Sequence, residues 1–491
     1  MPSGLFALGW IAPLPLLWSL HGLNARQRLR AGWRCGFFSF ALINWWIVVA
    51  ITRGAPFIGV PQPLGFLLGM LGAFLIGLIH GFLVALVALA WDSPKFSQSS
   101  TRWLMLWPLG LAALWMILDI LRCETPLAHS WGALAYTQWR DVALLQTASV
   151  VGQHGLTFVC VWFAASLALW LRAAQAGQKS AILWRAPLLV MLVLHLWGMT
   201  RIGRVENRNG EKPQILRVLL VQTTTGDNAS GDGRSSFAQA FDMTFRAARR
   251  GQVDLVVWPE TTFQVKRRNV KRRNVSPGAT SAAKATSAEQ LEIGRDVEGL
   301  EVRQLDELAR LTRTPILTGA DVSIEGGARS NQALLFEGAG QIQSRAKNHL
   351  VPFGERAPWS ETLPFLRALA PTPQIEPGTG TEPIVFDNRV LERVAIGTLI
   401  CFESCFQQPS RGLRRNGARA LFVLTNDDLF RGSEAPWQHA AMSALRAVEN
   451  GVPVAQSANG GYTFAVDQWG RFMVKSTFDV PQTAQVSLVL N

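Results

Sequence analysis

The stretch Val394-Ala-Ile-Gly-Thr-Leu-Ile-Cys401-Phe402-Glu403 decides the fold of the second half of this 491-residue chain. Its first seven residues, 394–400, are apolar or β-branched apart from one glycine, a pattern that predicts a buried strand. Such a strand places Cys401 at its carboxyl end, where α/β enzymes tend to hold reactive groups. A buried cysteine by itself is usually an inert small hydrophobic residue, so a nucleophile needs support from elsewhere in the chain.

Two other stretches could provide that support. Val253-Asp-Leu-Val-Val-Trp-Pro-Glu260 has the pattern of an apolar strand that ends on a carboxylate, and Lys347 precedes a Pro/Gly-rich turn that ends at Gly354. Thiolate chemistry needs a base for the thiol proton, a positive donor for the oxyanion of a tetrahedral intermediate and an acid for the leaving group. We therefore predict that Glu260, Lys347 and Cys401 form a catalytic set.

Three sequence pieces carry a family resemblance: WPE at 258–260, KNHLVPFGE at 347–355 and CFE at 401–403. In this order, after an apolar amino-terminal half, they resemble the Glu-Lys-Cys triad of the nitrilase superfamily, and most closely the apolipoprotein N-acyltransferase family. The resemblance extends over roughly residues 3–490 and includes downstream pieces such as Thr425-Asn-Asp427. It implies an α-β-β-α sandwich, the carbon-nitrogen hydrolase fold, for the catalytic domain.

Composition places part of the chain in a membrane. Hydrophobic residues make up 49% of the sequence, charged residues only 16%, and there are 19 tryptophans. The net charge of +13 is not accompanied by any nucleic-acid recognition motif, and much of the basic charge lies in short loops between apolar runs. We therefore expect affinity for anionic lipid surfaces and no nucleic-acid partner. The five cysteines lack the spacing of a zinc site, and we expect neither metal nor cofactor.

Six apolar segments fill the first 200 residues, and most are long enough to cross a hydrocarbon layer of about 30 Å as helices. They are 3–21, which contains two prolines and is expected to be short or broken, 35–52, 64–91, 103–121, 148–171 and 181–200. The predicted fold class is a polytopic α-helical membrane domain over 1–200 joined to an α/β nitrilase-like sandwich domain over 214–491. Residues 201–213 are polar and turn-rich, and we predict a linker there.

Basic residues in the loops predict the orientation. Four arginines lie in loop 22–34, whereas loop 53–63 has one basic residue. The loops 92–102 and 172–180 have two each, and the far longer loop 122–147 also has two. The positive-inside rule then assigns the first, third and fifth loops to the cytoplasm. We predict a multi-pass protein of the bacterial inner membrane with its catalytic domain on the periplasmic side.

The predicted outward loop 122–147 contains substrate-binding candidates. In the resembled family this loop contributes residues near the mouth of the active site. Four residues keep the family's spacing, Arg122, Trp131, Tyr136 and Gln138, although His129-Ser130 replaces a Phe-Pro. An interfacial aromatic anchor is the alternative interpretation. Trp437 is a further candidate, as part of the pocket wall.

A basic repeat interrupts the catalytic half. Lys266-Arg-Arg-Asn-Val270 is followed directly by a second copy, 271–275, and then by a Ser/Ala/Thr/Gly-rich stretch. Like charges repel and the stretch lacks apolar anchors, which favours a disordered insertion over about 264–290. The alternative is that this insertion contacts anionic headgroups.

The resemblance implies an enzyme, an N-acyltransferase that works through a thioester by a ping-pong scheme. Cys401 would take an acyl chain from a phospholipid with Glu260 as base, while Lys347 and the backbone N–H of Phe402 hold the oxyanion. The acceptor would be the α-amino group of the amino-terminal diacylglyceryl-cysteine of a lipoprotein. The implied function is lipoprotein maturation, and we expect a monomer.

Glu355 and Glu403 occupy positions of further active-site carboxylates in the family, and either could keep Lys347 charged and oriented. Ordinary surface or salt-bridge carboxylates are the alternative. Family members usually begin with one more transmembrane helix and end with another, whereas this chain begins near the second and stops at 486–491. We therefore expect either a trimmed gene product or a variant that lacks the anchor on one side. Two other functions stay open: a membrane-tethered nitrilase-type amidase or hydrolase, and a non-enzymatic membrane protein with a degenerate domain.

Overall fold

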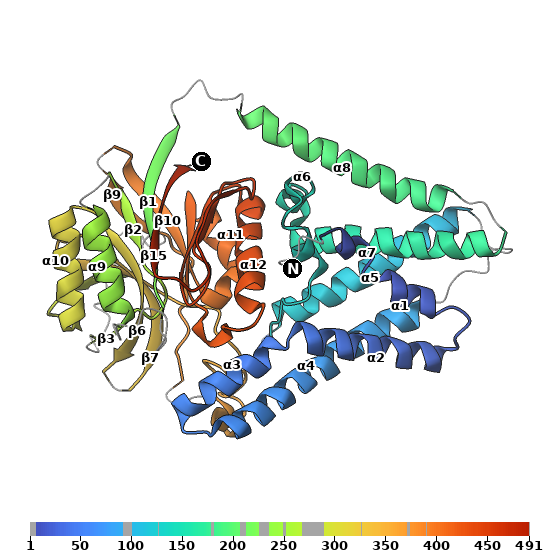
Figure 1. The fold of residues 1–491 in the computed structure, drawn as a ribbon, viewed down its shortest axis with the longest axis horizontal. Coiled ribbons are helices and arrows are strands. Elements are labelled where there is room, and N and C mark those ends of the chain that lie inside the picture. Colours follow the sequence, from blue (N-terminus) through green and yellow to red (C-terminus); the bar gives the residue numbers. More distant parts are fainter. Residues whose placement is uncertain are drawn as a thin grey trace, which may run out of the picture. The chain divides into compact units, whose positions relative to one another are not determined.

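The structure is a computed structural model that describes most of the chain. The described residues are 6–91, 101–125, 127–177, 181–206, 213–224, 235–248, 252–267, 289–325, 327–370, 374–388 and 390–490. They form two compact units (Figure 1). A helical unit comprises Met1–Asn209 with Gly432–Ala441, and a catalytic unit comprises Gly210–Arg431 with Met442–Asn491.

The helical unit is built almost entirely of α-helices. Its elements are η1 (Phe6–Trp10), α1 (Leu14–Ser19), α2 (Ala25–Ile43), α3 (Trp46–Gly54), η2 (Ala55–Ile58), α4 (Gln62–Ala90), α5 (Thr101–Glu124), η3 (Leu134–Gln138), α6 (Val142–Leu145), α7 (Ala148–Gln175) and α8 (Ile182–Glu206). Among the described residues, four helices are long and apolar enough to cross a membrane, namely α4, α5, α7 and α8. The pair α2 and α3 makes a fifth if it is counted as one span bent by 47°.

Two of the predicted segments differ in detail from the structure. The segment 35–52 is not one straight helix, because the chain bends between α2 and α3. Helix α2 also begins earlier, inside the basic loop 22–34, since Asn24 and Gln27 form a capping box in which each side chain accepts from the other residue's backbone N–H. The first segment contains only a shorter apolar helical stretch, Phe6–Ser19, in agreement with its two prolines.

Small residues let α2 and α4 approach closely. A Cβ on Gly81 of α4 would lie 3.0 Å from the backbone nitrogen of Phe37, and one on Gly36 of α2 would lie 2.7 Å from Val84 Cβ. Lipid provides little hydrophobic drive for helix pairing, so close backbone contact is a main source of packing energy in membranes.

The catalytic unit contains two β-sheets. Its strands are β1 (Gln214–Gln222), β2 (Leu255–Val257), β3 (Phe263–Arg267), β4 (Glu289–Glu292), β5 (Val297–Glu298), β6 (Ile316–Ile324), β7 (Arg329–Phe336), β8 (Gln341–Ala346), β9 (Ile384–Asn388), β10 (Glu392–Ile400), β11 (Ala420–Asn426), β12 (Val454–Asn459), β13 (Phe464–Val466), β14 (Phe472–Lys475) and β15 (Gln482–Leu490). Within the described residues, nine strands form the first sheet, with the order β15-β1-β2-β6-β7-β8-β4 and β3 paired with β5 and β6. The second has the order β14-β13-β12-β11-β10-β9.

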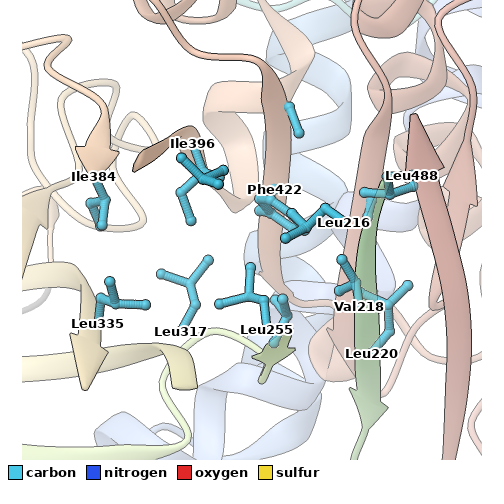
Figure 2. Close-up of a cluster of buried hydrophobic side chains, with 14 of the residues drawn as sticks. Leu216, Val218, Leu220, Leu255, Leu317, Leu335, Ile384, Ile396, Phe422 and Leu488 are labelled. Carbon is cyan, nitrogen blue, oxygen red and sulfur yellow. The ribbon is translucent and has the colours of Figure 1, made fainter. Parts of the chain in front are cut away.

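The two sheets pack face to face between layers of helix, which confirms the predicted α-β-β-α sandwich. Figure 2 shows Leu317 and Leu335 of the first sheet opposite Ile384 and Ile396 of the second. Helices α9 (Ser236–Ala248) and α10 (Leu300–Thr312) cover the outer face of the first sheet (Figure 1). Helix α11 (Gln407–Arg415) and the catalytic-unit part of α12 (Ala435–Asn450) lie outside the second. Three 3₁₀ turns complete the described elements here, η5 (Pro364–Leu369), η6 (Cys401–Cys405) and η7 (Asp428–Phe430).

The first and last strands of this unit are neighbours. β1 pairs antiparallel with β15 over nine residues, from Gln214 opposite Leu490 to Gln222 opposite Gln482. On its other side β1 pairs in parallel with β2, so the final strand of the described chain completes the sheet beside the first.

The boundary regions follow the predictions only in part. Helix α8 continues to Glu206, six residues into the predicted linker 201–213, and β1 starts at Gln214. Most of the predicted basic insertion, 268–288, lies outside the described residues. Its edges belong to β3, which contains Lys266 and Arg267, and to β4.

Candidate active site

Cys401 lies where β10 ends, the strand between β11 and the edge strand β9 of the second sheet. The apolar residues 394–400 form the last part of β10, as predicted, and Ile400 is fully buried. The chain then turns sharply into η6, because Cys401 adopts a φ of +48°, a left-handed conformation that is rare for residues other than glycine. Strained backbone of this kind is concentrated at functional sites, where surrounding structure holds it in place.

Glu260 follows β2 of the first sheet and is almost completely buried. The side-chain amide of Asn331 donates to its Oε1 over 2.7 Å, and the backbone N–H of Asn426 donates to its Oε2 over 2.8 Å. Burial raises the pKa of Glu260; the charge of Lys347 opposes that rise, and the nearby carboxylate of Glu355 adds to it. A carboxyl with a raised pKa is suited to accept and return a proton.

Lys347 lies between two carboxylates. Its Nζ is 2.8 Å from Oε1 of Glu355 and 3.4 Å from Oε1 of Glu260, and its side chain is only 1% exposed. Burial tends to lower the pKa of Lys347, but Glu355 and Glu260 outweigh this effect and raise the pKa overall. The lysine is therefore a fixed positive charge. Glu355 is itself anchored, since the backbone N–H of Val351 donates to its Oε2 over 2.8 Å.

The thiol of Cys401 faces this charged group. Burial raises its pKa well above the usual range, the negative charge of Glu260 raises it further, and Lys347 acts in the opposite direction. The thiol also makes a side-chain hydrogen bond with Thr425. A neutral thiol beside a carboxylate base and a fixed ammonium can be deprotonated during attack on a carbonyl. The structure thus brings the three predicted residues into one electrostatic cluster.

Glu403 pairs with Arg345 and not with Lys347, the partner that the sequence suggested. Its carboxylate forms a buried ion pair with Arg345, with Nη1 to Oε2 at 3.0 Å, and accepts the backbone N–H groups of Ile400 and Asn348 at 2.8 Å each. Arg345 is the last residue but one of β8 and lies two residues before Lys347. Glu403 therefore connects the strand that leads to the lysine with the turn that carries Cys401, whereas Glu355 is the carboxylate that contacts Lys347.

Two sequence profiles match this chain. The carbon-nitrogen hydrolase profile matches residues 142–491, and the apolipoprotein N-acyltransferase N-terminal domain profile matches residues 1–166. The chain belongs to the apolipoprotein N-acyltransferase family of carbon-nitrogen hydrolases. Membership confirms the predicted family and makes the protein a multi-span membrane acyltransferase.

Apolipoprotein N-acyltransferases of several bacteria are similar to this chain along most of its length. The Geobacter metallireducens protein is 28% identical over 477 residues, which cover 95% of this chain and 82% of the relative. The Chlorobaculum tepidum protein is 26% identical and covers 98% and 87% of the two chains. Among solved structures, Saccharomyces cerevisiae Nit3, of the nitrilase superfamily, aligns with 56% of this chain and 90% of its own at 18% identity, with a TM-score of 0.40.

The remaining predicted binding residues of this acyltransferase lie in the helical unit. Arg122 donates to Asp119 Oδ1 over 2.9 Å from Nε and to the carbonyl oxygens of His129 and Trp131 over 2.8 Å each. The hydroxyl of Tyr136 donates to Gln153 Oε1 over 2.6 Å.

The two tryptophan candidates lie against other aromatic rings. The ring of Trp131 lies 4.9 Å from that of Trp46, and Trp437 makes an edge contact with Trp139 at 4.9 Å. A role in substrate binding stays a prediction for all four candidates, Arg122, Trp131, Tyr136 and Trp437, because the contacts described here are internal to the helical unit.

Asn331 is a site residue that the sequence interpretation missed. It lies in β7, where its side chain donates to Glu260 and its backbone carbonyl accepts the N–H of Lys347 over 2.8 Å. It therefore positions two members of the predicted triad at once. The available signal was weak, because Asn331 lies in the polar first half of β7, Arg329-Ser-Asn-Gln332, and a polar run of this kind usually indicates only a strand end.

Replacing Asn331 by leucine should shift the pH profile of acyl transfer. The hydrogen bond from Asn331 lowers the pKa of Glu260, so its loss raises that pKa further. A base with a higher pKa becomes protonated, and therefore inactive, at a higher pH. The acid limb of the rate profile should therefore move to higher pH. Measured rates from pH 5 to 9 check this, and an unshifted acid limb would argue against Glu260 as the base.

Gly319 of β6 is required for the position of Glu260. A Cβ at Gly319 would lie 2.5 Å from the Cα of Glu260 and 3.0 Å from the carbonyl oxygen of Pro259, both backbone atoms that cannot easily move. We expect Gly319→Ala to lower the free energy of unfolding by about 1–3 kcal/mol and to reduce acyl transfer. Gly110→Ala, where a Cβ meets nothing within 4 Å, is the control. If both variants have the same thermal stability and the same activity, Gly319 is not required for the position of Glu260.

Proposed function

We propose that this acyltransferase moves an acyl chain from a phospholipid to the α-amino group of the amino-terminal diacylglyceryl-cysteine of lipoproteins, through a thioester on Cys401. The observation that supports the mechanism is the buried group of Glu260, Lys347 and Glu355 facing a thiol on a left-handed turn. A structural ion-pair network alone would not need a strained cysteine. The names of the relatives support the same reaction.

In the first half-reaction, Glu260 takes the proton of the Cys401 thiol as Sγ attacks the ester carbonyl carbon. The oxyanion that forms is held by Lys347 and by the backbone N–H of Phe402, and such donors are worth about 10²–10³ in rate. When the C–O bond of the ester breaks, the proton on Glu260 passes to the departing alkoxide. The products are a thioester on Cys401 and a lysophospholipid.

In the second half-reaction, the neutral amine of the acceptor attacks the thioester carbonyl carbon. Glu260 accepts a proton from the nitrogen, and the C–S bond breaks as the amide forms. The proton then passes from Glu260 to the sulfur, which restores the thiol. Lys347 keeps its proton throughout, because two carboxylates stabilise its charge.

A membrane location suits this chemistry. Both substrates are lipids, and extraction of an acyl chain from the bilayer costs about 0.8 kcal/mol per CH₂. We propose that the catalytic unit works as a monomer on the periplasmic side of the inner membrane, as the basic loops on the opposite side predict. Residues 122–147, with Arg122, Trp131 and Tyr136, would then lie on the substrate side, together with Trp437.

Mass spectrometry of the purified full-length chain tests this proposal. Mixing with phosphatidylethanolamine should add one acyl mass to the peptide that contains Cys401, and hydroxylamine should remove it. Adding a diacylglyceryl-cysteinyl peptide should transfer the chain to its amine, whereas the same peptide with an acetylated amine should leave the thioester in place.

Other outcomes of this experiment favour the other functions. If the acyl adduct is lost in buffer alone as fast as in the presence of the acceptor peptide, the protein is a hydrolase. Absence of any adduct would refute the proposal and favour a non-enzymatic protein.

A further inference from the structure

Three consecutive residues at the end of strand β11 surround the proposed proton transfer. The backbone N–H of Asn426 donates to Glu260 Oε2 over 2.8 Å, and the side chain of Thr425 is hydrogen-bonded to the Cys401 thiol. Both contacts hold members of the triad in place. The third residue, Asp427, has no role in the two half-reactions described above.

Asp427 is a buried carboxylate that holds the hydroxyl of Thr425. This hydroxyl donates to Asp427 Oδ1 over 2.9 Å, and both residues are fully buried. The backbone of Asp427 is fixed, because its N–H donates to the carbonyl oxygen of Asn459 over 2.8 Å. Its second carboxylate oxygen is closely packed, since a Cβ on Gly461 would lie 2.7 Å from Oδ2. A carboxylate fixed in this way keeps the hydroxyl in one orientation.

The Thr425 hydroxyl has a single proton, which decides what it can offer to the sulfur. While that proton is in the bond to Asp427, the hydroxyl oxygen can only accept, so the thiol of Cys401 donates its S–H to Thr425. A thiolate needs the opposite arrangement, in which Thr425 donates to the sulfur. Such a charge-assisted hydrogen bond is roughly twice as strong as a neutral one. Asp427 and a Cys401 thiolate therefore compete for one proton.

The electrostatics of the thiol agree with this competition. Burial is the largest cause that raises the pKa of the Cys401 thiol, and the charge of Glu260 is the next such cause. The charge of Asp427 raises this pKa further, whereas the hydrogen bond with Thr425 lowers it. The two residues thus act in opposite directions on one thiol, as expected of an acceptor and a donor that share a proton.

We propose that Asp427 is a positioning residue that keeps Cys401 as an unreactive thiol in the resting enzyme, by holding the proton of Thr425 away from the sulfur. When Glu260 removes the thiol proton during attack, the Thr425 hydroxyl turns from Asp427 to the sulfur and donates to it. A resting thiol is also less easily oxidised than a thiolate. The inference rests on the proposed role of Cys401 as nucleophile, but it concerns the ionisation of the thiol and not acyl transfer.

Alkylation of Cys401 in the full-length protein tests this role without any acyl donor. The thiol is partly exposed, so iodoacetamide can reach it, and peptide fragmentation in a mass spectrometer distinguishes it from Cys405. Between pH 7 and 9 the rate follows the small fraction of thiolate, because the pKa of the thiol lies well above its usual range. Failure of this proposal is therefore distinguishable from failure of the proposed function, which the acyl adduct tests.

Asp427→Asn should increase the alkylation rate about threefold. Asparagine has no charge and is a weaker acceptor, so the Thr425 proton becomes available to the sulfur. A thiol pKa lower by about one unit gives tenfold more thiolate, and the lower reactivity of each thiolate reduces this gain to about threefold. Thr425→Val has no hydroxyl to donate and should decrease the rate by a similar factor. Thr425→Ser keeps the hydroxyl and should keep the rate.

A double variant shows whether Asp427 acts through Thr425. In the Thr425→Val background, Asp427→Asn should change the rate by less than about twofold, because the hydroxyl that links the two groups is absent. Asp428→Asn is the matched control and should alkylate like wild type, since it removes the neighbouring carboxylate, which pairs with Arg431 at 2.6 Å.

Three results would overturn the proposal. The first is an unchanged rate in Asp427→Asn. The second is a full threefold effect of Asp427→Asn in the Thr425→Val background, which would mean that its charge acts through space and not through the hydroxyl. The third is an equal rate in Thr425→Val and Thr425→Ser, a comparison that decides the question without any change at Asp427.

Discussion

Cys401→Ser should reduce acyl transfer by about 10³-fold or more and should leave no thioester on the protein. A hydroxyl is a much weaker acid than a thiol, and the carboxylate of Glu260 is too weak a base to activate it efficiently. The two residues are nearly the same size, so the left-handed turn at φ +48° and the hydrogen bond with Thr425 should persist. Rates of amide formation with a diacylglyceryl-cysteinyl peptide check the prediction.

Cys405→Ala is the matched control for this variant. Cys405 ends the same 3₁₀ turn and is completely buried, so its loss removes a thiol four residues away without touching the proposed nucleophile. It should keep the acyl adduct on Cys401. Substantial transfer by Cys401→Ser, or an adduct that moves to another cysteine, would show that the assignment of the nucleophile is wrong.

Lys347→Met should have two separable effects. Loss of the ammonium removes an oxyanion donor, for which we expect a decrease of about 10²–10³ in rate. It also leaves Glu260 and Glu355 facing each other in a buried site, and breaking a buried ion pair in this way costs about 3–5 kcal/mol of stability. Kinetics and denaturant unfolding of the same variant measure the two effects.

The stability loss in Lys347→Met should depend on pH. Without the lysine, the folded-state pKa of one of the two carboxyls rises above its unfolded value, because two close carboxylates cannot both ionise easily. Such a group stabilises the fold below its unfolded pKa and loses that contribution as pH rises through its folded pKa. The deficit relative to wild type should therefore be smallest in acid and grow toward neutral pH.

A double variant separates charge repulsion from catalysis. Lys347→Met combined with Glu355→Gln removes one of the two facing carboxylates and should recover most of the lost stability at neutral pH. It should not recover acyl transfer, because the oxyanion donor is still absent. Recovery of activity in the double variant would mean that Lys347 has only a structural role.

Much of the catalytic fold could be predicted because its elements have strong local patterns. The apolar run 394–400 could hardly be anything but a buried strand, and it forms the last part of β10. Glu260 and Cys401 were predictable as site residues because each follows the carboxyl end of an apolar strand, where α/β enzymes tend to hold reactive groups, although the two strands belong to different sheets.

The interactions that support the site could not be predicted in the same way. Asn331 reaches Glu260 across 71 positions of sequence, and Arg345 reaches Glu403 across 58. No local sequence pattern indicates that two residues so far apart in the sequence are in contact, and a polar residue within a strand is compatible with many environments. The bend between α2 and α3 was missed for a related reason, since the sequence there is apolar on both sides. The start of α2 inside the predicted loop 22–34 was also missed, although Asn24 and Gln27 have the spacing of a capping box.

The pairing of β1 with β15 has a consequence for biogenesis. Because β15 completes the sheet beside β1, the sandwich cannot close until the ribosome has translated the chain through residue 490. The membrane helices, encoded first, can insert while translation continues, and the catalytic half must then remain an unfinished, aggregation-prone chain until β15 has been made. Chaperones that shield exposed strand edges would be needed during that interval.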